Sequence, residues 1–219
     1  MQRLILRYGY GYVMRAFLRL FVGVRFTSAR FLLDEKQFII VANHNSHLDT
    51  MTILSSLPRS IIHKVKPVAA ADHFGQTPLK TRLSNFFVNT LLIQRKRDKE
   101  NPENDPVNRM VQALDAGYSL ILFPEGTRGE PEVQQPLKPG VALVLTQRPH
   151  IKYVPAYMKG MGKAMPKHDS LIVPFASSIV FGQPRAVAQG HGVDEVLKQM
   201  EEDFRQLRAG IKPDGMAST

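Results

Sequence analysis

The chain has 219 residues, of which 43% are hydrophobic and 22% charged, a composition that suits one sizeable globular domain. It contains no cysteine, which excludes disulfides, thiolate metal sites and a cysteine nucleophile. The formal net charge of +10 indicates an anionic partner, which could be nucleic acid, an anionic membrane surface or a phosphorylated small molecule. None of the seven histidines lies in a dense cluster with carboxylates, so we expect no metal site.

Residues 1–26 are expected to form an amphipathic helix that lies on a membrane surface. Apolar side chains recur at steps of three and four, as on one face of a helix: Leu6, Tyr10, Val13, Phe17, Leu20 and Val24. The arginines on the other side are Arg3, Arg7, Arg15 and Arg19. These arginines interrupt the apolar run, so the segment resembles neither a membrane-spanning helix nor a signal peptide. Aromatic residues beside arginines favour the interface. The alternative is an ordinary amphipathic helix packed on the domain.

Beyond this segment, short apolar runs predict strands, and periodic apolar positions predict helices. The expected strands cover residues 38–42, 67–71, 91–93, 118–123, 151–158 and 178–181. The expected helices cover residues 49–57, 76–88, 107–116, 138–147 and 193–207, and residues 210–219 are expected to be a frayed tail. Pro155 favours the edge or the end of a sheet for its strand. The alternation predicts one α/β domain over residues 27–219, with a largely parallel or mixed central sheet flanked by helices.

A histidine and an aspartate follow the first of these strands. His44 comes two residues after the apolar run 38–42, and Asp49 opens the next helical pattern. One turn could fold the carboxylate back beneath the imidazole, which would give an oriented general base. The alternative is that His44 forms a hydrogen bond in a core and that Asp49 caps a helix.

Two further strands also lead directly into polar clusters. The run 91–93 leads into the basic cluster 94–97, which is either a ligand-binding group or solvated surface. The run 118–123 leads into residues 124–129, where two glycines would allow close approach of a ligand. Arg128 offers donors suited to phosphate or carboxylate. The alternative for this loop is a glycine turn with a surface ion pair between Glu125 and Arg128.

These strand ends resemble the ordered motifs of the glycerolipid acyltransferase family, which includes the 1-acylglycerol-3-phosphate acyltransferases. Residues 44–49 match the HxxxxD motif of that family, and residues 123–128 match its FPEGTR motif without a mismatch. Residues 92–95, in which an arginine follows apolar residues, resemble another motif, and residues 154–156 resemble a fourth. The resemblance covers about residues 38–185.

The resemblance implies roles for the residues in these motifs. His44 would be the general base that takes the proton of the acceptor hydroxyl as it attacks an acyl thioester, and Asp49 would hold the imidazole in the right tautomer. The chain has no G-x-S-x-G elbow, in keeping with a reaction that needs no covalent intermediate. The residues implied to bind the acceptor phosphate are Arg95, Glu125, Gly126, Thr127 and Arg128, with Glu125 orienting Arg128 or a substrate hydroxyl.

The chain also departs from the family pattern at several positions. Asn89 stands where the family usually has glycine, and Ala71 stands where many members carry a lysine near the active site. If that lysine stabilises the oxyanion elsewhere, Lys66 or a backbone N–H would have to replace it here. His47 is a second imidazole within the first motif, but the family spacing favours His44.

We therefore expect an O-acyltransferase that moves a fatty acyl group from acyl-CoA or acyl carrier protein to the free hydroxyl of a lysophospholipid. Lysophosphatidic acid is the leading acceptor, and its product would be phosphatidic acid. Beyond the thioester co-substrate we expect no cofactor. Residues 1–26 would hold the enzyme on an anionic membrane at the cytoplasmic face, as a monotopic protein.

Three alternatives remain open. The acceptor could be a lyso-ornithine lipid, another lysophospholipid or glycerol 3-phosphate. The enzyme could release the acyl group to water as a hydrolase. A basic nucleic-acid-binding domain would explain the charge, but the chain carries no recognisable recognition motif, so nucleic acid is not an expected partner.

Overall fold

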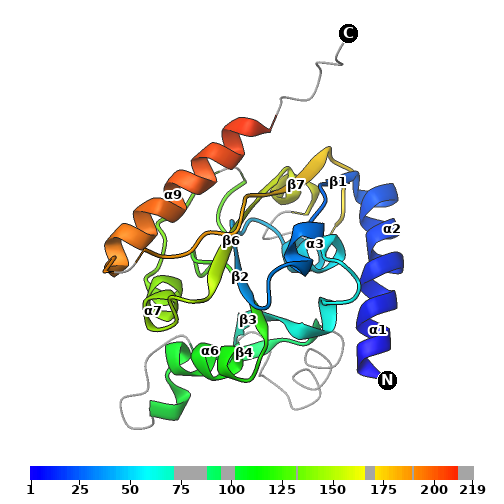
Figure 1. The fold of residues 1–219 in the computed structure, drawn as a ribbon. Coiled ribbons are helices and arrows are strands. Elements are labelled where there is room, and N and C mark those ends of the chain that lie inside the picture. The colour runs from blue at the N-terminus through cyan, green and yellow to red at the C-terminus, as the bar shows by residue number, and fades with distance from the viewer. Residues whose placement is uncertain (72–87, 95–101, 132, 166–170, 189, 212–219) are drawn as a thin grey trace.

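The computed structural model describes residues 1–71, 88–94, 102–131, 133–165, 171–188 and 190–211. At its centre is a seven-stranded sheet with the order β1-β7-β6-β2-β5-β3-β4 (Figure 1). The strands are β1 (Val24–Phe26), β2 (Phe38–Ala42), β3 (Val65–Ala70), β4 (Leu91–Ile93), β5 (Ser119–Leu122), β6 (Lys152–Lys159) and β7 (Ser177–Phe181). Within this sheet β6 and β7 pair antiparallel, and the other neighbours pair parallel. The expected α/β fold with a largely parallel sheet is confirmed.

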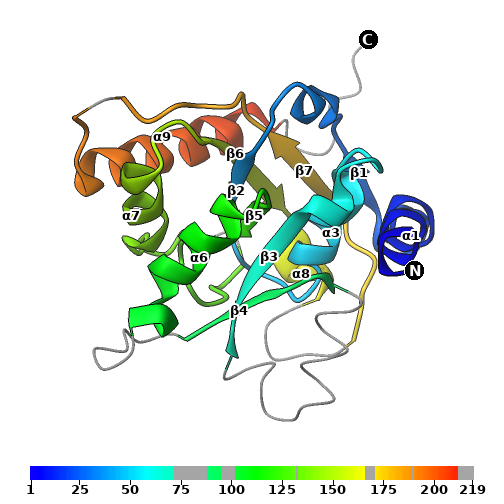
Figure 2. The same cartoon turned by 60° about the horizontal axis from the view of Figure 1, so that its bottom comes forward.

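Helices cover both faces of the sheet. Successive side chains of a strand point to opposite faces, so a strand that is apolar throughout needs cover on both. Ile40 of β2 faces a core shared with the N-terminal helix and α3 (Asp49–Ser56), whereas Ile39 and Val41 face a second core. The helices over that second core are α6 (Pro106–Asp115), α7 (Gly140–Gln147) and α9 (Val193–Gly210). Figures 1 and 2 show these two groups of helices on opposite sides of the sheet. All five residues of β2 are buried, as expected of a parallel strand covered on both faces.

The N-terminal helix runs from Gln2 to Val22 and ends earlier than predicted. It consists of α1 (Gln2–Tyr8), a π-helical stretch η1 (Gly9–Met14), α2 (Arg15–Phe17) and a second π-helical stretch η2 (Leu18–Val22). The helix expected over residues 1–26 stops at Gly23 because this residue adopts a left-handed conformation with φ 86°. Residues 24–26 then join the sheet as β1, a three-residue strand too short to show a pattern in the sequence.

The apolar stripe of this helix is divided between the core and the surface. Leu6 and Tyr10 are buried against the domain, whereas Val13 is 71% exposed and Leu20 is 76% exposed. The large apolar side chains that the helix leaves exposed are Leu4, Tyr8, Tyr12, Val13, Leu20 and Phe21. No helix in the described ranges is long and apolar enough to cross a membrane. The helix is therefore packed on the domain along one side and carries apolar residues on its outer side as well.

Pro155 lies in an interior strand, which contradicts the prediction of an edge or end position. β6 is flanked by β2 and β7. The ladder with β7 ends at the pair Ala156–Phe181, and the next pair toward the start of β6 is the isolated pair of Tyr153 with Arg185. Pro155 lies between these two pairs, and its carbonyl accepts from the N–H of Gly182 at 2.8 Å. The missing N–H of proline therefore falls in a gap of the ladder, where it costs no hydrogen bond.

The other predicted elements agree with the structure within a few residues. The strand expected over residues 67–71 is β3, which begins at Val65, and the C-terminal helix is α9. The predicted helix over residues 76–88 and the expected tail lie almost entirely outside the described residues. Short helical turns that the sequence did not predict are η3 (Arg30–Leu33), η4 (Ile62–Lys64), η5 (Pro102–Asn104) and α8 (Met161–Ala164).

Candidate active site

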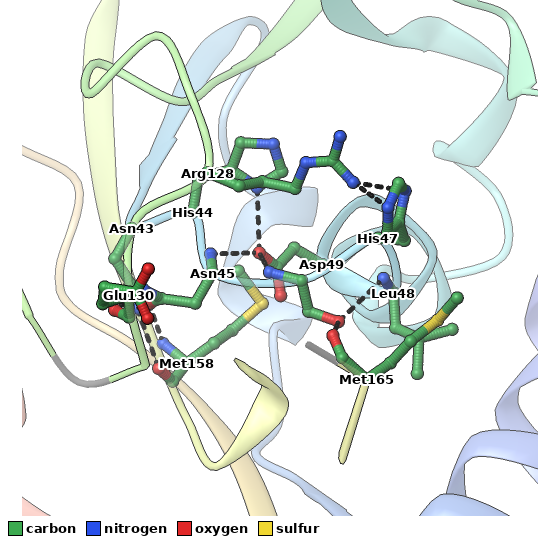
Figure 3. Close-up of polar contacts among 11 residues, drawn as sticks. Asn43, His44, Asn45, His47, Leu48, Asp49, Arg128, Glu130, Met158 and Met165 are labelled. Carbon is green, nitrogen blue, oxygen red and sulfur yellow. Dashed lines mark hydrogen bonds and ion pairs between the residues drawn. The ribbon is translucent and has the colours of Figure 1, made fainter. Parts of the chain in front are cut away.

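The loop between β2 and α3 brings a histidine and an aspartate into contact. The Nδ1 atom of His44 lies 2.9 Å from the Oδ2 atom of Asp49, the first residue of α3 (Figure 3). The Asp49 side chain is 1% exposed, and the His44 side chain is 21% exposed. The carboxylate is therefore buried beneath an imidazole that a substrate can reach.

Asp49 receives two further hydrogen bonds on the same oxygen atom. The backbone N–H groups of Asn45 and Ser46 each donate to Oδ2 at 2.8 Å. Donors directed at one oxygen stabilise the ionised carboxylate. Because a carboxylate only accepts hydrogen bonds, it favours the tautomer of His44 that carries its proton on Nδ1. The Nε2 atom is then the ring nitrogen that can take up a proton.

Polar side chains of the same loop fix its position against distant segments. The Asn43 amide donates to the carbonyl of Met158 at 2.9 Å and accepts from the N–H of Met158 at 2.7 Å. The Asn45 amide donates to the carbonyl of Glu130 at 2.7 Å. Asn43 and Asn45 were not among the predicted site residues, although they belong to a polar run that directly follows a buried strand. They hold the backbone that positions His44.

The loop that follows β5 packs directly against His44. Since β2 and β5 are parallel neighbours, their carboxyl ends meet at one edge of the sheet. The ring of Phe123 stacks on the His44 ring with centroids 4.1 Å apart, and the N–H of Gly129 donates to the His44 carbonyl at 2.9 Å. The Arg128 guanidinium contacts the exposed ring of His47, as Figure 3 shows. The two loops at residues 43–49 and 123–129 therefore form one site, in which Asp49 pairs with His44 and His47 faces Arg128.

Glu125 is buried in this site. It is 2% exposed, and neither carboxyl oxygen has a hydrogen-bond partner among the described residues. Burial raises the pKa of Glu125 to about 8, the nearby His44 backbone amide opposes the rise, and the charge of Asp49 adds to it. The ion pair considered for Glu125 and Arg128 does not form, because Glu125 points into the protein while Arg128 contacts His47. Glu125 is thus a buried acid beside the histidine loop, and its neutral form is favoured.

Gly126 and Thr127 are exposed at the tip of this loop, and a lysine lies across it. Gly126 has φ 73°, a conformation that side chains disfavour, and a Cβ atom there would lie 2.6 Å from the Nζ atom of Lys138. The backbone N–H of Lys138 donates to the Pro124 carbonyl at 2.8 Å. Lys138 was predicted only to begin a helix and was not among the predicted site residues. Its ammonium group lies beside the loop that also carries Arg128.

A family model matches the part of the chain that carries the histidine loop and the basic loop. The model described as Acyltransferase matches residues 23–178 and so includes both loops. The chain belongs to the acyltransferase family. The match begins at Gly23, directly after the N-terminal helix.

Two plant members of the acyltransferase family are similar to part of the chain. The chloroplastic 1-acyl-sn-glycerol-3-phosphate acyltransferase BAT2 of Brassica napus is 29% identical over 128 residues, which are 58% of this chain and 34% of that protein. The chloroplastic 1-acyl-sn-glycerol-3-phosphate acyltransferase LPAT1 of Arabidopsis thaliana is 30% identical over 128 residues, 58% of this chain and 33% of that protein. The chain matches about a third of the length of these curated relatives.

A solved acyltransferase structure has the same fold. It is the crystal structure of the 1-acyl-sn-glycerophosphate (LPA) acyltransferase PlsC from Thermotoga maritima, with a TM-score of 0.76 and 20% sequence identity. The alignment covers 97% of this chain and 83% of that chain. The agreement extends over nearly all of the chain and establishes the architecture.

The structure also bears on the departures from the family motifs. Asn89 adopts φ 57°, and its amide donates to the carbonyls of His63 and Val65, so asparagine occupies a left-handed position that glycine also favours. The Lys66 ammonium donates to Asn89 and lies 4.4 Å from the ring centroid of Tyr118, which precedes β5. The loop of residues 123–129 follows β5, at the opposite end of that strand. Arg95 lies outside the described residues.

Proposed function

We propose that this chain is an O-acyltransferase that transfers a fatty acyl group from a thioester to the free hydroxyl of lysophosphatidic acid. The observation that carries the proposal is the contact of His44 with the buried Asp49, made beside an exposed loop of donors. The donor is acyl-CoA or acyl carrier protein, and no further cofactor is required. The product is phosphatidic acid.

His44 acts as the general base in this reaction. Its Nε2 atom accepts the proton of the acceptor hydroxyl while the oxygen attacks the thioester carbonyl, and Asp49 stabilises the imidazolium that forms. The carbon–sulfur bond then breaks, and the leaving thiolate takes up the proton from His44. Base assistance of this kind is worth roughly 10²- to 10⁴-fold in rate. No covalent acyl-enzyme is required.

The acceptor phosphate is bound by the loop that follows β5. Arg128 offers its guanidinium, Gly126 and Thr127 offer backbone and hydroxyl donors, and Arg95 is expected to add a second guanidinium. We add Lys138 to this set, because its ammonium group lies across Gly126. Glu125 supports the loop from its buried side or orients a substrate hydroxyl.

The outer side of the N-terminal helix would hold the enzyme on the cytoplasmic face of a membrane. Exposed apolar residues such as Leu20 and Phe21 stand beside arginines, the composition of a helix that lies in an anionic interface. Both substrates carry long acyl chains, and full extraction of such a chain into water costs ~0.8 kcal/mol for each CH₂ group. A monotopic enzyme avoids that cost by taking its substrates from the surface.

The test is an acceptor panel assayed with both donors. Purified protein is incubated with labelled acyl-CoA or acyl carrier protein and with lysophosphatidic acid, another lysophospholipid, a lyso-ornithine lipid or glycerol 3-phosphate. We expect phosphatidic acid as the main product by mass, and a loss of at least roughly 100-fold in turnover for His44→Ala. Free fatty acid without a diacyl product would identify a hydrolase instead. Normal turnover by a folded His44→Ala variant would contradict the mechanism.

A further inference from the structure

A second site rich in arginine lies at the end of the N-terminal helix. A pocket of about 400 Å³ is bounded by the last turns of the helix and by β1. Its lining residues are Arg15, Arg19, Gly23, Val24, Arg25 and Phe26. Three of these six are arginines and none is acidic. None of them belongs to the loops that carry His44, Asp49 or Arg128, so the pocket is separate from the catalytic site.

Arg15 is held in place at this pocket by contacts with the domain. Its Nη1 atom donates to the carbonyl of Ser55 at 2.8 Å, and its guanidinium carbon lies 4.7 Å from the centroid of the Phe26 ring. A guanidinium fixed in this way loses little further conformational freedom when it binds a ligand. The remaining donors of its planar fork are suited to the oxygen atoms of a phosphate group.

Arg15 and Arg19 carry like charges close to each other. Partial burial lowers the pKa of Arg15, and the positive charge of Arg19 lowers it further. In the part of the chain that the structure describes, neither arginine forms an ion pair with a carboxylate. Two like charges one helical turn apart destabilise a helix unless an anion compensates them. An anion bound in the pocket would provide that compensation.

The helix that bounds the pocket indicates which anion it takes. Leu20 and Phe21 follow Arg19 directly in the helix and are 76% and 63% exposed. The helix thus offers cations at the pocket and exposed apolar side chains in its last turns, and a phospholipid surface presents both anionic head groups and apolar chains. We propose that this pocket binds the phosphate group of an anionic phospholipid in the membrane surface. The inference rests on the membrane association proposed above, and not on the acyl transfer.

The test compares arginines inside and outside the pocket. Wild type, Arg19→Gln, Arg15→Gln and Arg3→Gln are titrated with vesicles of phosphatidylcholine and phosphatidic acid at four to one, without acyl donor, and bound protein is measured by flotation. Arg3→Gln is the matched control, because it removes the same charge from the same helix outside the pocket. Arg19→Gln is the cleaner pocket variant, since Arg15 also bonds to Ser55. Thermal unfolding checks that each variant is folded.

A phosphate site in the pocket and a general attraction of the basic helix to an anionic membrane predict different losses of vesicle binding. We expect Arg19→Gln and Arg15→Gln to weaken vesicle binding by roughly 10- to 100-fold, the value of charge-assisted hydrogen bonds. Arg3→Gln should weaken it by only about fivefold, the effect of one basic residue near an anionic surface. Equal losses in all three variants would overturn the pocket and leave membrane association intact. If wild type fails to bind these vesicles, the proposed lipid pocket and the proposed membrane association are both wrong. The proposal of acyl transfer does not depend on this result.

Inorganic phosphate separates a lipid site from a site for the free ion. Vesicle binding is repeated with inorganic phosphate added at constant ionic strength. We expect wild type to remain bound, because a free ion lacks the apolar contact with the helix. If phosphate lowers wild-type binding to the level of Arg19→Gln, the pocket takes the free ion, and the lipid assignment is wrong.

Discussion

Glu125 is a residue whose chemistry the structure redefines. The motif suggested a charged partner for Arg128, whereas the side chain is buried without a hydrogen-bond partner in the described ranges. A buried carboxyl group without a partner favours its neutral form. Next to Asp49, a neutral acid avoids a second negative charge beneath His44. The FPEGTR loop therefore presents Arg128 and backbone donors outward, while its only acid is buried and has a raised pKa.

The raised pKa of Glu125 predicts a specific dependence of stability on pH. Between its ordinary value of 4.5 and about 8, the folded protein keeps a proton that the unfolded chain has released. The free energy of unfolding of wild type should therefore fall, relative to that of Glu125→Gln, as the pH rises through this interval. Urea unfolding at a series of pH values measures the difference.

A matched control isolates the buried carboxyl group in this experiment. Glu201→Gln removes an exposed acid from α9, and we expect its free energy of unfolding to parallel that of wild type over the same interval. Parallel curves for wild type and Glu125→Gln would show that Glu125 is ionised in the folded protein at neutral pH.

The N-terminal helix is an element with two different apolar sides. Leu18 and Val22 are fully buried in the core beneath the helix, while Leu20 and Phe21 face outward. Deletion of the helix would remove core residues together with the outer side. Single substitutions on each side separate stability from binding to a membrane.

The two sides should respond differently to substitution. Leu18→Ala removes buried methyl groups and should lower the free energy of unfolding by about 2–5 kcal/mol. Leu20→Ser should leave unfolding nearly unchanged and weaken vesicle binding about tenfold or more, as a leucine that enters a membrane contributes ~1.5–3 kcal/mol. Urea unfolding and vesicle flotation of both variants measure the two effects. Unchanged flotation of Leu20→Ser would argue against insertion of this side.

At the scale of the whole molecule, a buried polar cluster ties α9 to the centre of the sheet. The hydroxyl of Tyr153 in β6 donates to one carboxylate oxygen of Asp203 in α9 at 2.7 Å, and Arg185 bonds to the other at 2.9 Å. Asp203 is 4% exposed. Both oxygens of a buried charge are thus paired, and β6 is fixed against the helix on its second face.

Removal of one partner from this cluster should destabilise the fold. Tyr153→Phe leaves a carboxylate oxygen of Asp203 buried without its donor, which costs about 1–3 kcal/mol in the free energy of unfolding. Tyr10→Phe is the control, because the Tyr10 hydroxyl has no hydrogen-bond partner within the described ranges, and it should change little. Thermal and urea unfolding compare the two variants. Equal effects would show that the pairing with Asp203 contributes no net stability.

The fold class and the two loops that form the candidate site could be predicted from the sequence. Alternating apolar runs specify strands and helices because each element has its own period, and the motifs at residues 44–49 and 123–128 follow strands whose carboxyl ends must meet in a parallel sheet. The order of the strands, the position of Pro155 and the short β1 were decided by the tertiary structure. Each depends on pairing between segments distant in the chain.

The partner of each polar group likewise depends on how distant segments of the chain pack together. Asp49 pairs with His44, whereas His47 contacts Arg128 and Glu125 has no hydrogen-bond partner among the described residues. The spacing along the chain determines which residues can approach one another. The burial of each polar side chain, and the hydrogen-bond donors within its reach, depend on the helices and strands packed around it. For the same reason, the helical pattern of residues 1–26 could not show which apolar side chains are covered by the domain and which remain exposed.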